Sequence, residues 1–366
     1  MSVVAPTTTR AEPRALATAT TPDVLPRRTS VRVPILVALS ALVGAALLGV
    51  SVGPADLSLP TVLSALVSHL PMLHHHEHVS RLQSNIVWQI RLPRVVLGGL
   101  VGAMLAGGGA AYQGVFRNPL ADPYLLGVAA GAGLGATAVI VTGTQTSIFL
   151  PVAAFAGAVG AVALTYVVGA TVGRRGTTTS IVLAGVAVAA LLTAVQTYLQ
   201  QRHTPALQNV YAWILGRLTT ATWSEVVLIL PYVVLSAVVL VAHRRLLDVL
   251  RVGEDEADTM GVSSSRVRLS VVAAATLGTA AAVAVSGLIG FVGIIVPHTV
   301  RLTTNASYRV VLPVSMVGGA AFLILADVVA RTVEAPAEVP IGVVTAFVGA
   351  PFFLFVLRSR RAQRGM

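Results

Sequence analysis

The chain has 366 residues, of which 55% are hydrophobic and 11% are charged, and its formal net charge is +11. Soluble domains carry roughly 25% charged residues, so this composition excludes a domain that faces water on all sides. Cysteine is absent and all 25 basic residues are arginine, which excludes thiolate sites and lysine-dependent chemistry. The arginines flank apolar segments, so we attribute the positive charge to membrane topology and not to nucleic-acid binding.

Residues 1–32 are rich in Thr, Ala, Pro and Arg and show no apolar periodicity. This composition predicts a disordered tail, which we place in the cytoplasm. A basic tail before an apolar run is also typical of a signal peptide. No small-residue cleavage site follows, however, so we expect an uncleaved first span.

Apolar runs of about 20 residues, each long enough to cross about 30 Å of hydrocarbon, recur along the rest of the chain. They are continuous and do not alternate with period two, which favours helices over the strands of a β-barrel. We predict an all-α polytopic membrane protein with a transmembrane domain over 33–357 and a short cytoplasmic tail over 358–366. Its ten predicted spans lie near 33–53, 93–115, 124–144, 148–172, 181–200, 223–243, 269–286, 287–300, 311–331 and 340–357.

The block 269–300 could form one long span or two short ones, and Gly290 and Gly293 favour two. Glycines four residues apart, such as Gly98 and Gly102, predict close contact between helices. With the amino terminus inside, nineteen of the 25 arginines fall in inner segments. The positive-inside rule therefore places both termini in the cytoplasm.

The first outer loop contains PMLHHHEHVS at 71–80. Adjacent histidines on one short stretch cannot all reach one ion, and such a loop binds metal weakly. We therefore predict no metal site and interpret the stretch as a solvated loop, with transient contact to metal, haem or a protein as the alternative. The weak metal candidates are His74, His75, His76 and His78.

Three arginines run against the charge bias at the outer ends of two spans. Arg91 and Arg94 lie in QIRLPRVV, and Arg331 ends ADVVAR. Interfacial snorkelling is the simpler explanation. Their concentration suggests instead a receptor for carboxylates, which guanidinium groups bind in a fork.

The longest inner polar segment, 244–269, contains GEDEADTMG. Acidic residues favour the start of a helix and glycine favours its end. We expect a short helix that docks a partner, although a solvated loop is the alternative. Further on, Pro297 breaks a helix, and His298 and Arg301 lie three residues apart on one face near the inner surface. We interpret His298 as a helix-end residue. The predicted docking residues are Gly253, Glu254, Asp255, Glu256, Ala257, Asp258, Met260 and Gly261.

Several motifs in order along the chain resemble the FecCD family of membrane permeases. That family serves ABC importers for ferric siderophores, haem and vitamin B12. The resemblance covers about 85 to 357. Its motifs are RLPR, YQGVFRNPLADPYLLGVAAGAGLGA, IVLAG, WILGRL, GFVGIIVPHTVRL, ADVVAR and EVPIGVVTAFVGAPFF.

The resemblance implies a type II ABC importer permease architecture in the plasma membrane of a bacterium. It also implies a homodimer or a similar permease heterodimer, two cytoplasmic ABC ATPase subunits and an extracytoplasmic substrate-binding protein. By similarity to the B12 permease, 253–261 would be the coupling helix, and Arg91, Arg94 and Arg331 would receive acidic residues of the binding protein. Thr178 and Thr179 would align with the cytoplasmic gate, although TTTS at 177–180 departs from the family pattern.

WILGRL also departs from the usual family pattern, and it places Arg217 in an outer loop. There it would line the entrance and attract anionic cargo, or be one more interfacial arginine. We expect a non-catalytic permease without a cofactor of its own, because a chain without lysine has no P-loop. ATP and Mg would be used by the partner ATPase.

The expected cargo is a ferric siderophore, with cobalamin and haem as alternatives. An ion-coupled secondary transporter needs a carboxylate deep in the membrane, and the only candidate, Asp327, lies near an outer end. An intramembrane enzyme is less consistent still, because HHHEH is not an HExxH motif.

Overall fold

The computed structural model describes residues 32–53, 55, 57–67, 79–143, 148–171, 178–304 and 307–364. Helices account for most of these residues and none of them lies in a strand, which confirms the all-α class. Residues 1–31, the histidine cluster at 74–78 and residues 172–177 lie outside the described residues.

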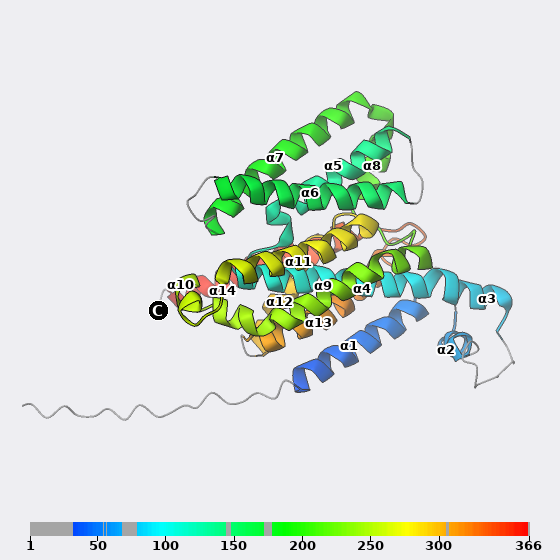
Figure 1. Ribbon diagram of the computed structural model, residues 1–366. Coiled ribbons are helices and arrows are strands. Elements are labelled where there is room, and N and C mark those ends of the chain that lie inside the picture. Colours follow the sequence, from blue (N-terminus) through cyan, green and yellow to red (C-terminus); the bar gives the residue numbers. More distant parts are fainter. Residues whose placement is uncertain are drawn as a thin grey trace, which may run out of the picture.

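Each of the ten predicted spans coincides with a helix (Figure 1). These helices are α1 (Arg32–Ser51), α4 (Leu92–Val115), α5 (Val128–Val141), α6 (Phe149–Thr171), α7 (Thr178–Arg202), α9 (Trp223–Leu250), α11 (Ser264–Ser286), α12 (Val292–Thr303), α13 (Tyr308–Ala330) and α14 (Ile341–Arg364). The connecting helices are α2 (Leu59–Val67), α3 (Arg81–Asn85), the π-helix η1 (Ile86–Arg91), the 3₁₀ helices η2 (Pro123–Leu126) and η3 (Thr204–Ala206), α8 (Leu207–Ile214) and α10 (Glu254–Thr259).

In the described part of the chain, 7 helices are long and apolar enough to cross a membrane. One is a continuous helical run, Arg81–Val115, formed by α3, η1 and α4. The other three helices at predicted spans, α5, α12 and the apolar part of α14 (Ile341–Val356), are shorter. For example, the 14 residues of α5 reach about 21 Å at 1.5 Å per residue, less than about 30 Å of hydrocarbon.

The 269–300 block forms two helices, as predicted. Gly287 and Phe291 both have positive φ, 72° and 69°, and the chain between them is not helical. Neighbouring segments satisfy its backbone: the Ile289 N–H donates to the Tyr124 hydroxyl at 3.2 Å, and that hydroxyl donates to Ile289 O at 3.1 Å. Irregular backbone at membrane depth is tolerated where protein supplies such partners.

Glycines bring the central helices into close contact. A Cβ added at Gly102 of α4 would overlap the carbonyl of Gly319 on α13, and one at Gly131 of α5 would overlap the carbonyl of Gly157 on α6. This arrangement confirms the predicted close helix contacts at Gly102 and Gly131. As a result α4 is buried along most of its length.

The helices form a bundle with two distinct ends (Figure 1). Helices α5, α6 and α7 pack together on one side, and α1 packs against α13 on the other. We call the end near α3 and the start of α4 the arginine end, because it holds Arg91 and Arg94. The opposite end, near α10 and the carboxyl end of α14, is the α10 end.

Candidate functional site

At the arginine end, Arg94 binds two carboxylates from distant parts of the chain. Its Nε and Nη2 donate to Asp327 Oδ1 at 3.0 and 2.8 Å. Its Nη1 and Nη2 donate to the two oxygens of Glu338 at 2.9 and 2.8 Å. Arg94 lies in the first turn of α4, Asp327 in the last turn of α13, and Glu338 in the loop after α13. The guanidinium thereby joins three segments in one charge-assisted network.

The other two outer arginines are also buried, with exposed fractions of 3% for Arg91 and 2% for Arg331. Arg331 Nη2 donates to Gly49 O at 2.7 Å, and its Nε lies 3.5 Å from Asp327 Oδ2. Arg91 Nη1 donates to Val50 O at 2.8 Å. Both arginines therefore bind carbonyl groups at the end of α1 and fix that helix against α4 and α13.

The receptor role expected for Arg91, Arg94 and Arg331 stays a prediction, but all three side chains are buried in this structure. A guanidinium with 8% exposure and two carboxylate partners is not free to bind a third carboxylate. The network also accounts for Asp327, the only carboxylate considered for ion coupling. Its oxygens accept hydrogen bonds from Arg94, so it is an ion-pair partner and not a vacant cation ligand.

Arg217, predicted at an entrance, is half-buried and lies between two cavities at the arginine end. One cavity, of about 240 Å³, is also lined by Arg94, Asp327 and Glu338. The other, of about 390 Å³, is also lined by Glu225 and by apolar residues of α6 and α11. The structure therefore brings Arg217 and Arg94 to the same cavity.

The short helix expected within 253–261 is present as α10, Glu254–Thr259. Gly253 precedes it with a φ of 154°. Residues with a side chain rarely adopt this backbone conformation, so a substitution here would be strained. Glu254 pairs with Arg268 of α11 at 2.8 Å, and Asp258 Oδ1 accepts from the Ser264 N–H at 3.0 Å. Two acidic residues thus hold α10 against the start of α11.

The remaining side of α10 faces outward. Ala257 is fully buried, whereas Asp255 and Glu256 are exposed and Met260 is 59% exposed. Val252 beside the helix is 60% exposed. Of the predicted docking residues, Glu254, Ala257 and Asp258 anchor the helix, whereas Asp255, Glu256 and Met260 are exposed. Val252, which was not predicted, adds a second exposed apolar side chain. We call Val252, Asp255, Glu256 and Met260 the α10 surface.

The predicted gate residues begin α7 at the α10 end of the bundle. Thr179 is exposed, and the neighbouring Ser180 hydroxyl donates to Gly169 O of α6 at 3.3 Å. On α12, His298 is 7% exposed, and Arg301 Nη2 donates to the Tyr308 hydroxyl at 3.1 Å. Pro297 lies inside α12 and does not end it, so the predicted helix break at Pro297 and the interpretation of His298 as a helix-end residue are wrong. Arg301 lies in the last turn of α12.

Glu338 is the residue that sequence reasoning missed. It was noted only as part of EVPIGVV, and its partner Arg94 is 244 positions away in the sequence. The sequence shows an acidic residue close to Pro340, in the loop that follows Arg331. The residues around Glu338 do not indicate which arginine it pairs with.

These features define a class of protein: a multi-pass helical membrane protein with a buried ionic network at one end and a short acidic helix at the other. The model of the FecCD transport family matches residues 38–359. The chain belongs to the FecCD transport family.

Named relatives agree with this membership. The chain is 46% identical over 278 residues to the cobalamin import system permease protein of Halobacterium salinarum, over 76% of this chain and 74% of that relative. It is 37% identical over 289 residues to the hemin transport system permease protein of Yersinia pestis. That alignment covers 76% of this chain and 85% of the relative. A solved structure of a metal-chelate type ABC transporter in an inward-facing conformation aligns with a TM-score of 0.79 and 29% identity, over 89% of this chain and 98% of that one.

We expect Asp327→Ala to lower the free energy of unfolding by about 3–5 kcal/mol, because it leaves Arg94 and Arg331 buried without this shared carboxylate. Thermal unfolding of the purified protein in detergent measures the change. Glu334→Ala is the matched control, because Glu334 is exposed in the loop after α13, and it should change stability by less than about 0.5 kcal/mol. Equal effects of the two substitutions would contradict the structural role of the network.

Proposed function

We propose that this chain is the permease subunit of an ATP-driven importer that carries a metal chelate inward across the cytoplasmic membrane. The observation that carries the proposal is α10, a short acidic helix held rigidly between two spans of a FecCD permease. The membrane domain over 33–357 forms the path, and both termini lie in the cytoplasm. The chain performs no bond chemistry and needs no cofactor, since partner ATPase subunits use the ATP and Mg.

In this proposal the α10 surface docks on the ATPase. Its carboxylates meet basic groups of the partner, and Val252 and Met260 supply apolar contact. The ion pair of Glu254 with Arg268 and the hydrogen bond from Ser264 to Asp258 transmit movement of α10 to α11. Helix α11 leads to the non-helical segment 287–291, where a change of angle toward α12 can occur. ATP binding and hydrolysis would thus alternate access between the two faces.

We further propose that two permease chains enclose the path and that Thr178 and Thr179 form its cytoplasmic gate. Apolar side chains on α14 support a subunit interface, because Phe347 is 77% exposed and Phe355 is 70% exposed. A cavity of about 550 Å³ lies beside them, lined by α8, α14 and Leu288. An identical chain is the simplest partner for this face, and a similar permease chain would serve equally.

Ferric siderophore is the cargo class that we propose first. Cobalamin is the second candidate, favoured by the 46% identity to a cobalamin import permease, and haem is the third. The entrance role expected for Arg217 stays a prediction, because Glu225 lines the same cavity and would repel anionic cargo. Titration of the partner binding protein with ferric hydroxamate, cobalamin and hemin tests these choices. Tightest binding of ferric hydroxamate supports the first choice, and failure of all three would overturn the metal-chelate proposal.

We expect Asp255→Ala combined with Glu256→Ala to weaken co-purification of the ATPase at least tenfold, because two charge-assisted contacts would be lost. The thermal stability of the permease should stay unchanged, since both side chains are exposed. Glu334→Ala, which removes an exposed carboxylate at the opposite end, is the control. Normal ATPase association and normal uptake in the double variant would exclude the α10 surface as the docking site.

The binding protein is expected at the arginine end, where a carboxylate can reach Arg94 only if Glu338 leaves it. If Arg94 is a docking residue, Glu338→Gln should tighten binding of the binding protein, by up to about tenfold, because a neutral amide competes less well for the guanidinium. Surface plasmon resonance with immobilised permease measures this affinity, with Glu334→Gln as control. Weaker or unchanged affinity would show that docking does not use Arg94.

A further inference from the structure

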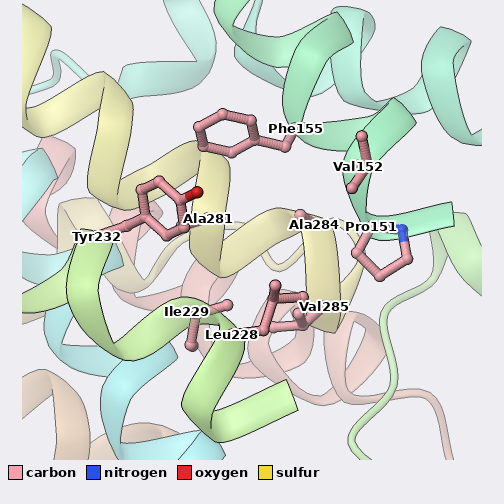
Figure 2. A pocket seen from close by; sticks show the side chains of 9 residues that line it. All are labelled: Pro151, Val152, Phe155, Leu228, Ile229, Tyr232, Ala281, Ala284 and Val285. Atoms are coloured by element: carbon pink, nitrogen blue, oxygen red, sulfur yellow. The ribbon is translucent and has the colours of Figure 1, made fainter. Parts of the chain in front are cut away.

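A narrow apolar groove runs along α11 between α6 and α9, as Figure 2 shows. Helix α11 packs against both α6 and α9. Small residues of α11, Ala281 and Ala284, form part of the groove, and α6 and α9 supply Phe155 and Tyr232. The rings of these two residues lie 5.3 Å apart between centroids, which places an aromatic pair across the two walls of the groove.

Toward the arginine end the groove continues into the 390 Å³ cavity that Arg217 lines. Both spaces share Pro151, Leu228, Ala284 and Val285 as lining residues. The groove itself is small, about 60 Å³, so it admits a thin chain and not a helix, whose diameter is about 10 Å. The combined space therefore has a narrow apolar part and a wider polar mouth.

The mouth carries one positive and one negative side chain. Arg217 donates its backbone N–H to Ser286 O at 2.8 Å, and within the described residues its guanidinium has no hydrogen bond or ion pair. Glu225 is close enough to Arg217 for an electrostatic interaction. One Glu225 oxygen accepts from the Thr222 N–H at 3.2 Å, which leaves the other oxygen for a ligand. The mouth thus presents a cation and an anion together.

Apolar side chains surround the groove on the outside of the bundle. On α6 Phe149 is 54% exposed and Val152 is 50% exposed, and on α9 Val227 is 65% exposed. In a membrane-spanning bundle such side chains face hydrocarbon. From Glu225 to Tyr232 the wall of α9 extends about 10 Å, which suits part of one acyl chain with its headgroup at the membrane interface.

We propose that this groove binds a zwitterionic membrane phospholipid of the phosphatidylethanolamine type. One acyl chain lies along Ala284 and Ala281 toward the Phe155–Tyr232 pair. The phosphate binds Arg217 and the ammonium binds Glu225. An anionic cargo fits this site less well, because Glu225 repels it and the apolar groove would stay unfilled.

Native mass spectrometry of the full-length chain in detergent, titrated with dioleoyl phosphatidylethanolamine and dioleoyl phosphatidylglycerol, tests the proposal. The wild type should retain phosphatidylethanolamine more tightly. Arg217→Gln should weaken retention of both lipids about tenfold. Glu225→Gln keeps the helix cap, because glutamine also serves in a capping box, and should remove the preference for phosphatidylethanolamine. Arg202→Gln, an exposed arginine at the end of α7, is the matched control and should change neither affinity.

A larger side chain offers a second test, since Ala284→Phe should fill the groove and abolish retention of both lipids. If that variant fails to fold, Arg217→Gln and Glu225→Gln still test whether the groove binds the lipid. Equal affinity of the wild type for both lipids would overturn the proposal, as would unchanged retention in Arg217→Gln. If Arg217→Gln instead raises the KM of cargo uptake while lipid retention stays constant, Arg217 serves the cargo entrance and the lipid site is excluded.

Discussion

The contact of Arg94 with Asp327 and Glu338 is the interaction on which the rest of the arginine end depends. Charges within a membrane protein are costly unless they are paired, and here two carboxylates offset the cations of α4 and α13. Because each partner comes from a different segment, the network sets how far α4 and α13 slide past one another. It also holds the loop after α13 over the same cavity that Arg217 lines.

Close packing extends this constraint through the bundle. The contact of Gly102 with Gly319 lets α4 and α13 approach without intervening side chains, so the ionic network and the helix backbones form one rigid unit. By contrast, the chain from α11 to α12 is interrupted at 287–291 and depends on neighbours such as Tyr124 for its hydrogen bonds. A permease that changes access between two faces needs both a rigid unit and a place where angles can change.

The sequence predicted most helices and several site residues for reasons that are local. Apolar runs mark the spans, and the acidic cluster between glycines marks α10. Each of these signals is contained within one short stretch of the sequence. The role of the outer arginines could not be derived in this way. Snorkelling, docking and internal pairing all place arginine at a helix end, and only the positions of Asp327 and Glu338 distinguish them. The span predicted at 124–144 is longer than helix α5, which has 14 residues. The reason is related, since packing and not hydropathy alone decides where a buried helix stops.

By itself, the sequence determined that this chain is an all-α membrane protein of the FecCD family. Hydropathy and the order of the motifs can be recognised without knowing which residues are in contact. The sequence also located the short acidic helix α10. Only the tertiary structure decided which charges are available. It buried Arg91, Arg94 and Arg331 in internal bonds, divided the α10 residues into anchors and an exposed surface, and placed Arg217 and Glu225 at the mouth of one groove. Burial and pairing depend on segments that are far apart in sequence, and folding alone brings them together.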